Sequence, residues 1–281
     1  MNDRVSQARN ISVIIPTWNR AHKIVAAIDS VLAQSYGFYE LIVVDDASTD
    51  HTDEVVRVYM EKDSRIRYHK QPVNGGAAAA RNTGVQMSEA DIIAFLDSDD
   101  IWLPEKLEKQ MAYWELHPDY SLIYSKFRYR EGSEGGYDPF ADTDGKTMEG
   151  DLYLALLESN VIGTPTMLVD KGAFIACGGF DEGLRALEDW EFAVRFAKDY
   201  LIGFTDAYLT ECMIERKTSV SADNEEHFRV RFRMLKDHRE ILEQNGKLEY
   251  LIAGLFSAAQ QVGLGDFAKV CFRETFFPGI S

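Results

Sequence analysis

Short apolar segments of strand length alternate with helical patterns through the first hundred residues of this chain. The expected strands cover residues 11–16, 41–44, 66–69 and 92–96, of which all but 66–69 are apolar, and the helical patterns cover residues 24–32, 50–60 and 75–85. Alternating strands and helices predict a mostly parallel sheet with helices on both faces, an α/β fold. Three of the apolar segments stop at a polar residue, namely Thr17, Asp45 and Asp97. Because ligands bind beyond the carboxyl ends of strands in such sheets, these residues predict a binding site at one edge.

The remainder of the chain is less regular. We expect helices over 105–116, near 152–157 and from about Asp189, strands over 121–129 and 166–169, and a long loop over 131–150. From about residue 224 the character of the sequence changes, with helices expected over 228–243 and 248–262 and a short aromatic-rich tail over 267–277. The sequence therefore predicts an α/β domain over 1–220 and a C-terminal helical appendage over 221–281.

Composition excludes several classes of protein. The 281 residues carry 46 acidic and 30 basic side chains, a net charge of −16 that argues against a nucleic-acid-binding surface. Three scattered cysteines imply neither a disulfide framework nor a zinc site. Residues 1–10 lack the apolar segment of a signal peptide, and no apolar run approaches the roughly 20 residues that span a bilayer. We therefore expect a cytoplasmic protein.

The segment Asp97-Ser98-Asp99-Asp100 places three carboxylates in four positions after an apolar strand. Side chains two apart on extended backbone share a face, so Asp97 and Asp99 are expected to point the same way. Paired carboxylates suit Mg²⁺ or Mn²⁺, which take one or two such ligands together with phosphate and water. The alternative is an acidic turn that caps the next helix, and Asp100 in particular is either a supporting residue or such a cap.

Five sequence blocks occur in an order that resembles the family 2 glycosyltransferases. They are SVIIPTWNR at 12–20, VVDDASTD at 43–50, ARNTG at 80–84, FLDSDD at 95–100, and GGFDE at 178–182 followed by EDWE at 188–191. The resemblance covers roughly residues 10–217 and leaves the C-terminal appendage outside it. It implies a GT-A fold and an inverting, nucleotide-sugar-dependent enzyme.

The resemblance also implies which residues bind the donor. A UDP-sugar is expected to contact Pro16, Thr17, Asn19, Arg20, Asp45, Asp46, Arg81, Asp97 and Ser98, and a Mn²⁺ or Mg²⁺ ion is expected at Asp97 and Asp99. Arg81 is expected to neutralise phosphate. Two alternatives stay open: Asp45 and Asp46 form a turn and cap the helix over 50–60, or Arg81 lies on a solvated helix face.

Asp189 matches the residue that serves as catalytic base in inverting members of the family. A sugar hydroxyl is a weak nucleophile until a positioned carboxylate accepts its proton, so the reaction needs such a group. Alternatively, Glu188 and Asp189 only complement the dipole of the helix that they begin. Arg195, two turns later, is expected to pair with that carboxylate or with phosphate. The implied acceptor is a saccharide or a lipid-linked saccharide in surface or exported polysaccharide synthesis.

Rival interpretations fit less well. A haloacid-dehalogenase phosphatase places its Asp-x-Asp early in the chain, and a calcium loop that starts at Asp97 needs glycine where Trp102 stands. A non-catalytic sugar-nucleotide-binding or scaffold subunit is the alternative function, which intact Asp97, Asp99 and Asp189 argue against. In the appendage, apolar side chains predict packing on the catalytic domain or in a homo-oligomer, with peripheral contact at the inner face of a membrane as the alternative. These side chains are Leu251, Ile252, Leu255, Phe256, Phe267, Phe272, Phe276 and Phe277.

Overall fold

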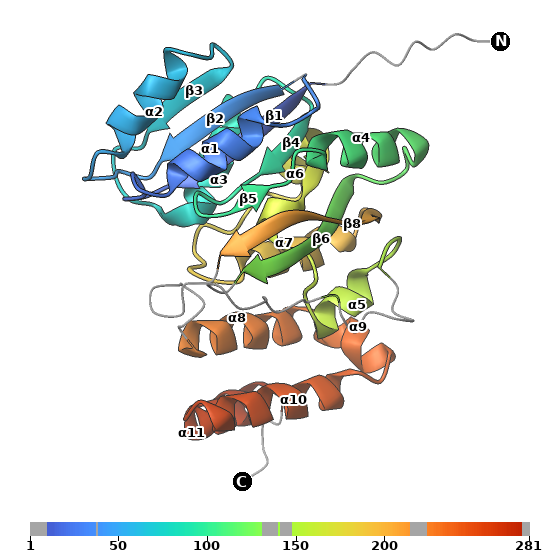
Figure 1. Cartoon of the computed structure of the whole chain (residues 1–281). Coiled ribbons are helices and arrows are strands. Elements are labelled where there is room, and N and C mark those ends of the chain that lie inside the picture. Colours follow the sequence, from blue (N-terminus) through green and yellow to red (C-terminus); the bar gives the residue numbers. More distant parts are fainter. Residues whose placement is uncertain (1–9, 38, 131–139, 141–147, 214–223, 277–281) are drawn as a thin grey trace, which may run out of the picture.

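A mixed eight-stranded sheet forms the centre of the computed structural model, which describes residues 10–37, 39–130, 140, 148–213 and 224–276. The strand order is β3-β2-β1-β4-β7-β6-β8-β5 (Figure 1). Strands β3, β2, β1 and β4 are parallel, β7 runs antiparallel to both β4 and β6, β8 is parallel to β6, and β5 is antiparallel to β8. The strands are β1 Ile11–Thr17, β2 Tyr39–Asp45, β3 Ile66–Lys70, β4 Ile92–Phe95, β5 Ile101–Trp102, β6 Leu122–Arg130, β7 Leu168–Asp170 and β8 Ile202–Met213.

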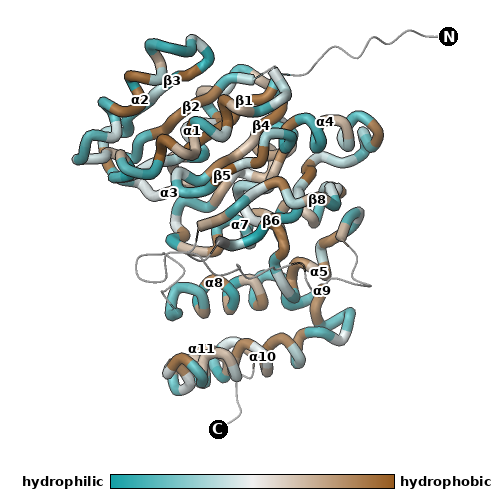
Figure 2. The backbone as a smooth tube through the Cα atoms, in the orientation of Figure 1, coloured by the Kyte–Doolittle hydropathy of each residue, from teal (hydrophilic) through white to brown (hydrophobic). Residues whose placement is uncertain are grey.

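Helices cover both faces of this sheet, as the alternating pattern predicts. Side chains alternate across β1, so Ile14 packs in one core with α3, α6 and α7, whereas Val13 and Ile15 pack in another with α1, α2 and α4. Hydrophobic segments accordingly gather at β1, β2 and β4 in Figure 2. The helices are α1 Ile24–Leu32, α2 Thr52–Met60, α3 Gly76–Met87, α4 Lys106–Leu116, α5 Tyr153–Glu158, α6 Lys171–Ala176, α7 Glu188–Ala197, α8 Asn224–Asp237, α9 Arg239–Gln244, α10 Leu248–Gln261 and α11 Gly265–Phe276.

A glycine sets the distance between α3 and the sheet. A Cβ atom at Gly84 would lie 2.5 Å from Cγ2 of Ile14, so no larger residue fits without moving the helix away from β1. This close approach gives the glycine of the ARNTG block a packing role, and it fixes the position of Arg81 one turn earlier on the same helix.

Several details differ from the sequence-based expectations. Strand β4 ends at Phe95, and a turn follows in which the backbone N–H of Asp100 donates to the carbonyl of Asp97 at 3.1 Å. The prediction of an extended backbone over 97–99 is therefore wrong. Thr166 lies in a short 3-10 helix, Thr164–Thr166, rather than in a strand. The helix expected over 228–243 is interrupted at His238, whose ψ of 21° separates α8 from α9.

The C-terminal helices form a layer below the α/β part, with α8 nearest to it and α10 and α11 beyond (Figure 1). They belong to the same core as α5 and α7, and Arg233 on α8 pairs with Asp181 at 2.9 Å. Lys247 pairs with Glu158 of α5 in addition. The expected packing of the C-terminal appendage on the α/β part is thus present. The predicted domain boundary at 220/221, most of the loop expected over 131–150, and Phe277 lie outside the described residues.

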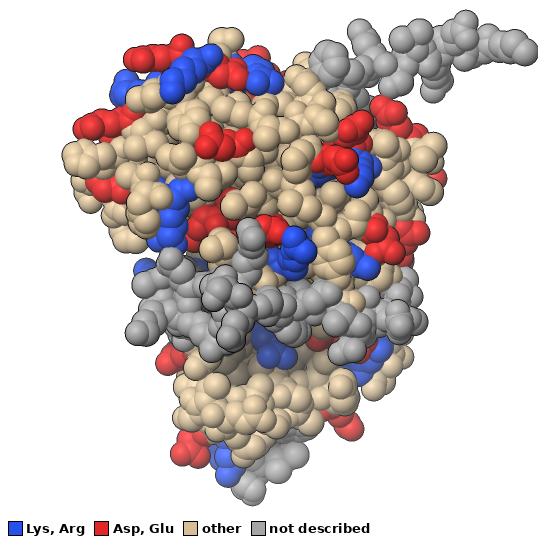
Figure 3. Space-filling view, viewed as in Figure 1, with Lys and Arg blue, Asp and Glu red and all other residues tan. Residues whose placement is uncertain are grey.

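No helix in the described ranges combines the length and the apolar character needed to cross a membrane. On the face shown in Figure 3, the described Lys and Arg side chains are interspersed with Asp and Glu. Neither sign of charge dominates that face.

Candidate active site

The carboxyl ends of β1 and β2 lie side by side, because Thr17 pairs with Asp45 in the parallel register. Asp45 is fully buried, and its carboxylate accepts hydrogen bonds from the backbone N–H of Ser48 at 2.7 Å and from the hydroxyl of Tyr68. Thr17 is 3% exposed, and its Oγ1 finds no hydrogen-bond partner among the described residues. Pro16, the preceding residue of β1, is buried beside Val44. This sheet edge therefore holds one anchored carboxylate and one unpaired buried hydroxyl.

Asp46 caps a helix, although not the one expected. Its Oδ1 accepts from the backbone N–H of Gly75 at 2.7 Å and its Oδ2 from that of Gly76 at 2.8 Å. Both donors stand at the start of α3, so Asp46 caps the helix that carries Arg81, and Asp50 instead accepts from the N–H of Thr52 at the start of α2. Asp46 is thus a helix cap, as the alternative interpretation proposed, but it caps α3 and not the helix over 50–60.

Within the described part of the chain, three non-glycine residues adopt left-handed backbone, and each adjoins a site segment. Their φ angles are 53° at Asn19, 61° at Ala47 and 58° at Leu187. Such conformations cost energy and persist where surrounding contacts hold them. Asn19 is held by its side-chain oxygen, which accepts from the N–H of Thr49 at 2.8 Å and so ties the loop after β1 to the loop after β2.

The turn after β4 brings Asp97 and Asp99 together by a different route from the one expected. Their side chains are 30% and 27% exposed, and Ser98 between them is buried. Burial, and then the charge of Asp97, raise the pKa of Asp99 above its usual value, which requires the two carboxyls to be close. Arg20 and Lys23 approach Asp99 at 3.7 and 3.9 Å. The pair is thus partly solvated and lies next to two cationic side chains.

This donor set fits a divalent cation that completes its coordination with substrate. Within the described ranges, no three His, Cys, Asp or Glu side chains are grouped to hold a metal by themselves. Mg²⁺ is commonly held by one or two carboxylates together with phosphate oxygens and water, and Asp97 and Asp99 supply that number. Asp100 is 6% exposed and accepts from the N–H of Met213 at 2.9 Å, so the third carboxylate connects the turn to β8.

Arg81 joins this turn to the start of α7. Its guanidinium donates to Oδ1 of Asp97 at 2.6 Å and to Oε1 of Glu188 at 2.7 Å, and its side chain is 4% exposed. Burial alone would lower the pKa of Arg81, but the two carboxylates raise it above the usual value and keep the side chain charged. The solvated-face alternative for Arg81 is therefore wrong. One guanidinium joins Asp97 to Glu188, which follows Arg81 by 107 positions in the chain.

Asp189 lies beside this bridge, in the first turn of α7. Its Oδ1 accepts from the backbone N–H of Trp190 at 2.7 Å, as the helix-dipole alternative also allows. Burial, followed by the negative charge of Glu188, raises the pKa of Asp189 to about 7. A carboxyl with this pKa ionises near neutrality, where a general base works best.

The GGFDE block forms a loop that is fastened from two sides. Asn82 on α3 accepts from the N–H of Phe180 at 3.0 Å and donates to its carbonyl at 2.9 Å. Arg195 on α7 donates to the carbonyl of Gly179 at 2.8 Å and pairs with Glu191 at 2.7 Å. The pairing of Arg195 with Asp189 that the sequence suggested is therefore wrong, because Arg195 instead supports the loop.

Residues 12–169 match the sequence model of glycosyl transferase family 2. The chain belongs to this family. A glycosyltransferase of Haemophilus influenzae is 30% identical over 76% of this chain and 71% of its own length. WfgD of Escherichia coli, a UDP-Glc:alpha-D-GlcNAc-diphosphoundecaprenol beta-1,3-glucosyltransferase, is 43% identical over 42% of this chain and 45% of its own. A glycosyltransferase of Rickettsia felis is 33% identical over 79% of this chain, which spans only 36% of that protein.

Solved structures share the fold at low sequence identity. Mannosyltransferase PcManGT of Pyrobaculum calidifontis, in complex with GDP-Man and Mn²⁺, has a TM-score of 0.69 at 18% identity and covers 98% of this chain and 77% of its own. TarS of Staphylococcus aureus, in complex with UDP-GlcNAc, has a TM-score of 0.67 at 19% identity and covers 95% and 89%. The fold is that of GT-A glycosyltransferases, as the motif resemblance implied.

Sequence reasoning missed three residues that shape the site. Tyr68 holds Asp45, Asn82 holds the GGFDE loop, and Lys23 approaches Asp99. Asn82 stood within a recognised block and could have been singled out. Tyr68 and Lys23 carried no signal, because their importance arises only when separate segments fold together.

Proposed function

We propose that this chain is an inverting glycosyltransferase that moves a sugar from a UDP-sugar to a hydroxyl of a saccharide or lipid-linked acceptor. The setting we propose is the synthesis of surface or exported polysaccharide. The observation that carries the proposal is the Arg81 bridge, which gathers the carboxylates of Asp97 and Glu188 around one buried guanidinium. Membership of the family and the UDP-Glc donor in the name of WfgD support the same assignment.

Donor binding is assigned to the adjoining ends of β1 and β2. The unpaired hydroxyl of Thr17 can exchange a hydrogen bond with the base. Asp45 already accepts two hydrogen bonds, but a carboxylate has about four lone-pair positions and retains capacity for a base N–H or a ribose hydroxyl. Because Ser48 and Tyr68 fix its orientation, Asp45 meets the ligand without reorganising.

Asp97 and Asp99 would hold Mn²⁺ or Mg²⁺ in this proposal. When bound, such an ion offsets the negative charge that develops on the departing nucleoside diphosphate. The chain's own residues do the rest at this end. Arg81 orients Asp97 through an ion pair, and Arg20 and Lys23 add positive charge next to Asp99.

Asp189 is the proposed general base. The acceptor oxygen attacks the anomeric carbon while Asp189 takes the hydroxyl proton. The bond from that carbon to the phosphate oxygen breaks, and the nucleoside diphosphate leaves. A pKa of about 7 matches this role, because the carboxylate is available at neutral pH and remains basic enough to accept the proton.

The test is a donor panel with purified protein. UDP-sugars and GDP-sugars are incubated with Mn²⁺ or with EDTA, and nucleoside diphosphate release is measured alongside binding by calorimetry. We expect Mn²⁺-dependent binding and slow hydrolysis of a UDP-sugar. Binding without any turnover, even with candidate acceptors, would favour the non-catalytic subunit, and a preference for GDP-sugars would contradict the assigned donor.

A further inference from the structure

Helix α8 carries three arginines that differ in their partners. Arg229 pairs with Glu225 at 2.5 Å and Arg233 pairs with Asp181 at 2.9 Å. Arg231 contacts no carboxylate in the described part of the chain. Its guanidinium lies 5.5 Å from the centre of the Trp190 ring, and burial lowers its pKa. The side chain is only partly exposed, and partial burial of a cation without a counter-charge costs free energy.

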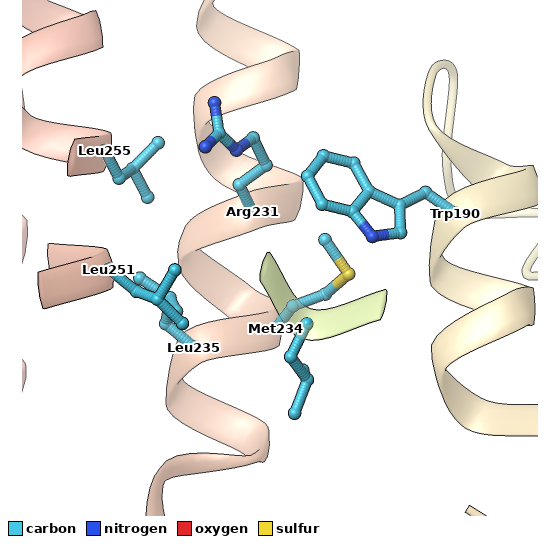
Figure 4. Close-up of a pocket in the computed structure, with 7 residues that line it drawn as sticks. Trp190, Arg231, Met234, Leu235, Leu251 and Leu255 are labelled. Atoms are coloured by element: carbon cyan, nitrogen blue, oxygen red, sulfur yellow. The ribbon is translucent and has the colours of Figure 1, made fainter. Parts of the chain in front are cut away.

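Arg231 lines two neighbouring cavities between the α/β part and the C-terminal helices. The smaller lies between Trp190 of α7, Arg231 of α8, and Leu251 and Leu255 of α10 (Figure 4). The larger, of about 130 Å³, is several times the size that holds one water, and one of its lining residues, Val262, is 44% exposed. Both cavities share Arg231 and Leu255, so the Arg231 side chain lies between the larger cavity and the smaller one beside α7.

The walls of these cavities define the chemistry of a ligand. Apart from Arg231, the larger cavity has two polar side chains, Asn224 and His227, and the rest of its wall is apolar. Neither cavity has an acidic side chain in its described lining, although the chain carries a net charge of −16. A cation among hydrocarbon walls suits an anion attached to an apolar chain. A free sugar phosphate suits this cavity less well, because the sugar hydroxyls would lose hydrogen bonds to water among the apolar walls.

We propose that the larger cavity binds the phosphate and the adjoining hydrocarbon of a lipid-linked acceptor, with Arg231 as the phosphate ligand. The inference rests on the acceptor class in the proposed function and narrows it to the lipid-linked form. Trp190, which follows Asp189 directly, lines the smaller cavity, and its ring contacts the Arg231 guanidinium, so Arg231 is linked to the helix that carries the base. An anionic acceptor held by Arg231 is thereby anchored against α7.

The test measures binding of simple probes to the full chain, without any need for turnover. Octyl phosphate, used below its micellar concentration, is compared by calorimetry with octanol and with inorganic phosphate. Arg231→Gln removes the unpaired charge, and Arg229→Gln removes a paired charge from the same helix as the matched control. We expect octyl phosphate to bind most tightly, and to bind at least about tenfold more weakly to Arg231→Gln, because a hydrogen-bonded charge pair is lost. Arg229→Gln should bind like the wild type.

Arg231→Met separates binding from folding. If Arg231 serves a ligand, this change loses octyl phosphate binding while Tm stays the same or rises, because a partly buried charge without a counter-charge is removed. A lowered Tm with octyl phosphate binding intact would overturn the proposal and leave a structural cation–π contact. Equal binding of octanol, or inorganic phosphate binding as tightly as octyl phosphate, would also overturn it. Mn²⁺-dependent UDP-sugar binding, measured on the same samples, shows independently whether the proposed function holds.

Discussion

Replacing Arg81 with methionine removes the bridge between the proposed metal pair and the start of α7. The wild-type guanidinium makes two charged hydrogen bonds, of 2.6 and 2.7 Å, from a side chain that is 4% exposed. Each such bond contributes about 1.5–3 kcal/mol. Water reaches Asp97 and Glu188, which are 30% and 17% exposed, and recovers part of that loss. We therefore expect a destabilisation of about 2–4 kcal/mol, which corresponds to a fall in Tm of roughly 4–16 °C.

Urea and thermal unfolding measure this loss, with Arg57→Met as the control. Arg57 is 66% exposed and approaches Asp53 only at 4.0 Å, so its removal should change stability by less than about 0.5 kcal/mol. A double-mutant cycle with Glu188→Gln should give a coupling energy of about 0.5–3 kcal/mol, because the two residues are in contact. If Arg81→Met is no more destabilising than Arg57→Met, the bridge does not hold the site together.

The same variant should shift the pH profile. Burial and Glu188 raise the pKa of Asp189 to about 7, and the positive charge of Arg81 opposes that rise. Without Arg81, the pKa of Asp189 should be higher still, and the acid limb of turnover should move to higher pH. An acid limb that stays in place would refute the electrostatic link between Arg81 and Asp189.

Three further outcomes follow from the structure. Asp99→Ala should abolish turnover and the Mn²⁺-dependent part of UDP binding, and equal UDP affinity of the wild type with and without Mn²⁺ in calorimetry would contradict the metal assignment. Asp45→Asn should weaken UDP binding by about 1–3 kcal/mol through loss of a charged acceptor, and an unchanged Kd would leave Asp45 as a purely structural residue. Deleting residues 246–281 should yield insoluble protein, because Phe228, Met234 and Leu235 pack in the core that α10 and α11 complete; a soluble truncated chain with a cooperative melt would refute this packing account.

The parallel half of the sheet could be predicted because β1, β2 and β4 contain apolar runs that end at polar residues. Strand β8 could not, since its sequence mixes Thr205, Asp206, Thr210 and Glu211 among apolar residues and has neither a clean alternation nor an apolar run. It is a strand because it pairs with β6 from Ile202 to Met213, with two register shifts between Ser125 and Phe127 of β6. Tertiary pairing there outweighs the local pattern.

The residues of the site could be predicted from motifs, but the contacts that these residues make could not. The motifs singled out Arg81 for phosphate, whereas the folded chain gives its terminal nitrogens to Asp97 and Glu188. Asp46 was expected at a nearby helix and caps α3 instead, because the folded loops bring Gly75 and Gly76 to it. Arg231 carried no motif at all, since the absence of a counter-charge becomes visible only after the helices pack.

The central claim is that Asp189 takes the acceptor proton, and the pH dependence of turnover by Asp189→Asn tests it most directly. The amide keeps the size of the side chain but accepts no proton at neutral pH. We expect turnover to fall by about 10²–10⁴, the range of general base catalysis, with UDP-sugar affinity preserved. Wild-type turnover should rise with pH through about 7, as Asp189 ionises, and the variant should lack that limb. Near wild-type turnover by Asp189→Asn, or an unchanged acid limb, would contradict the account.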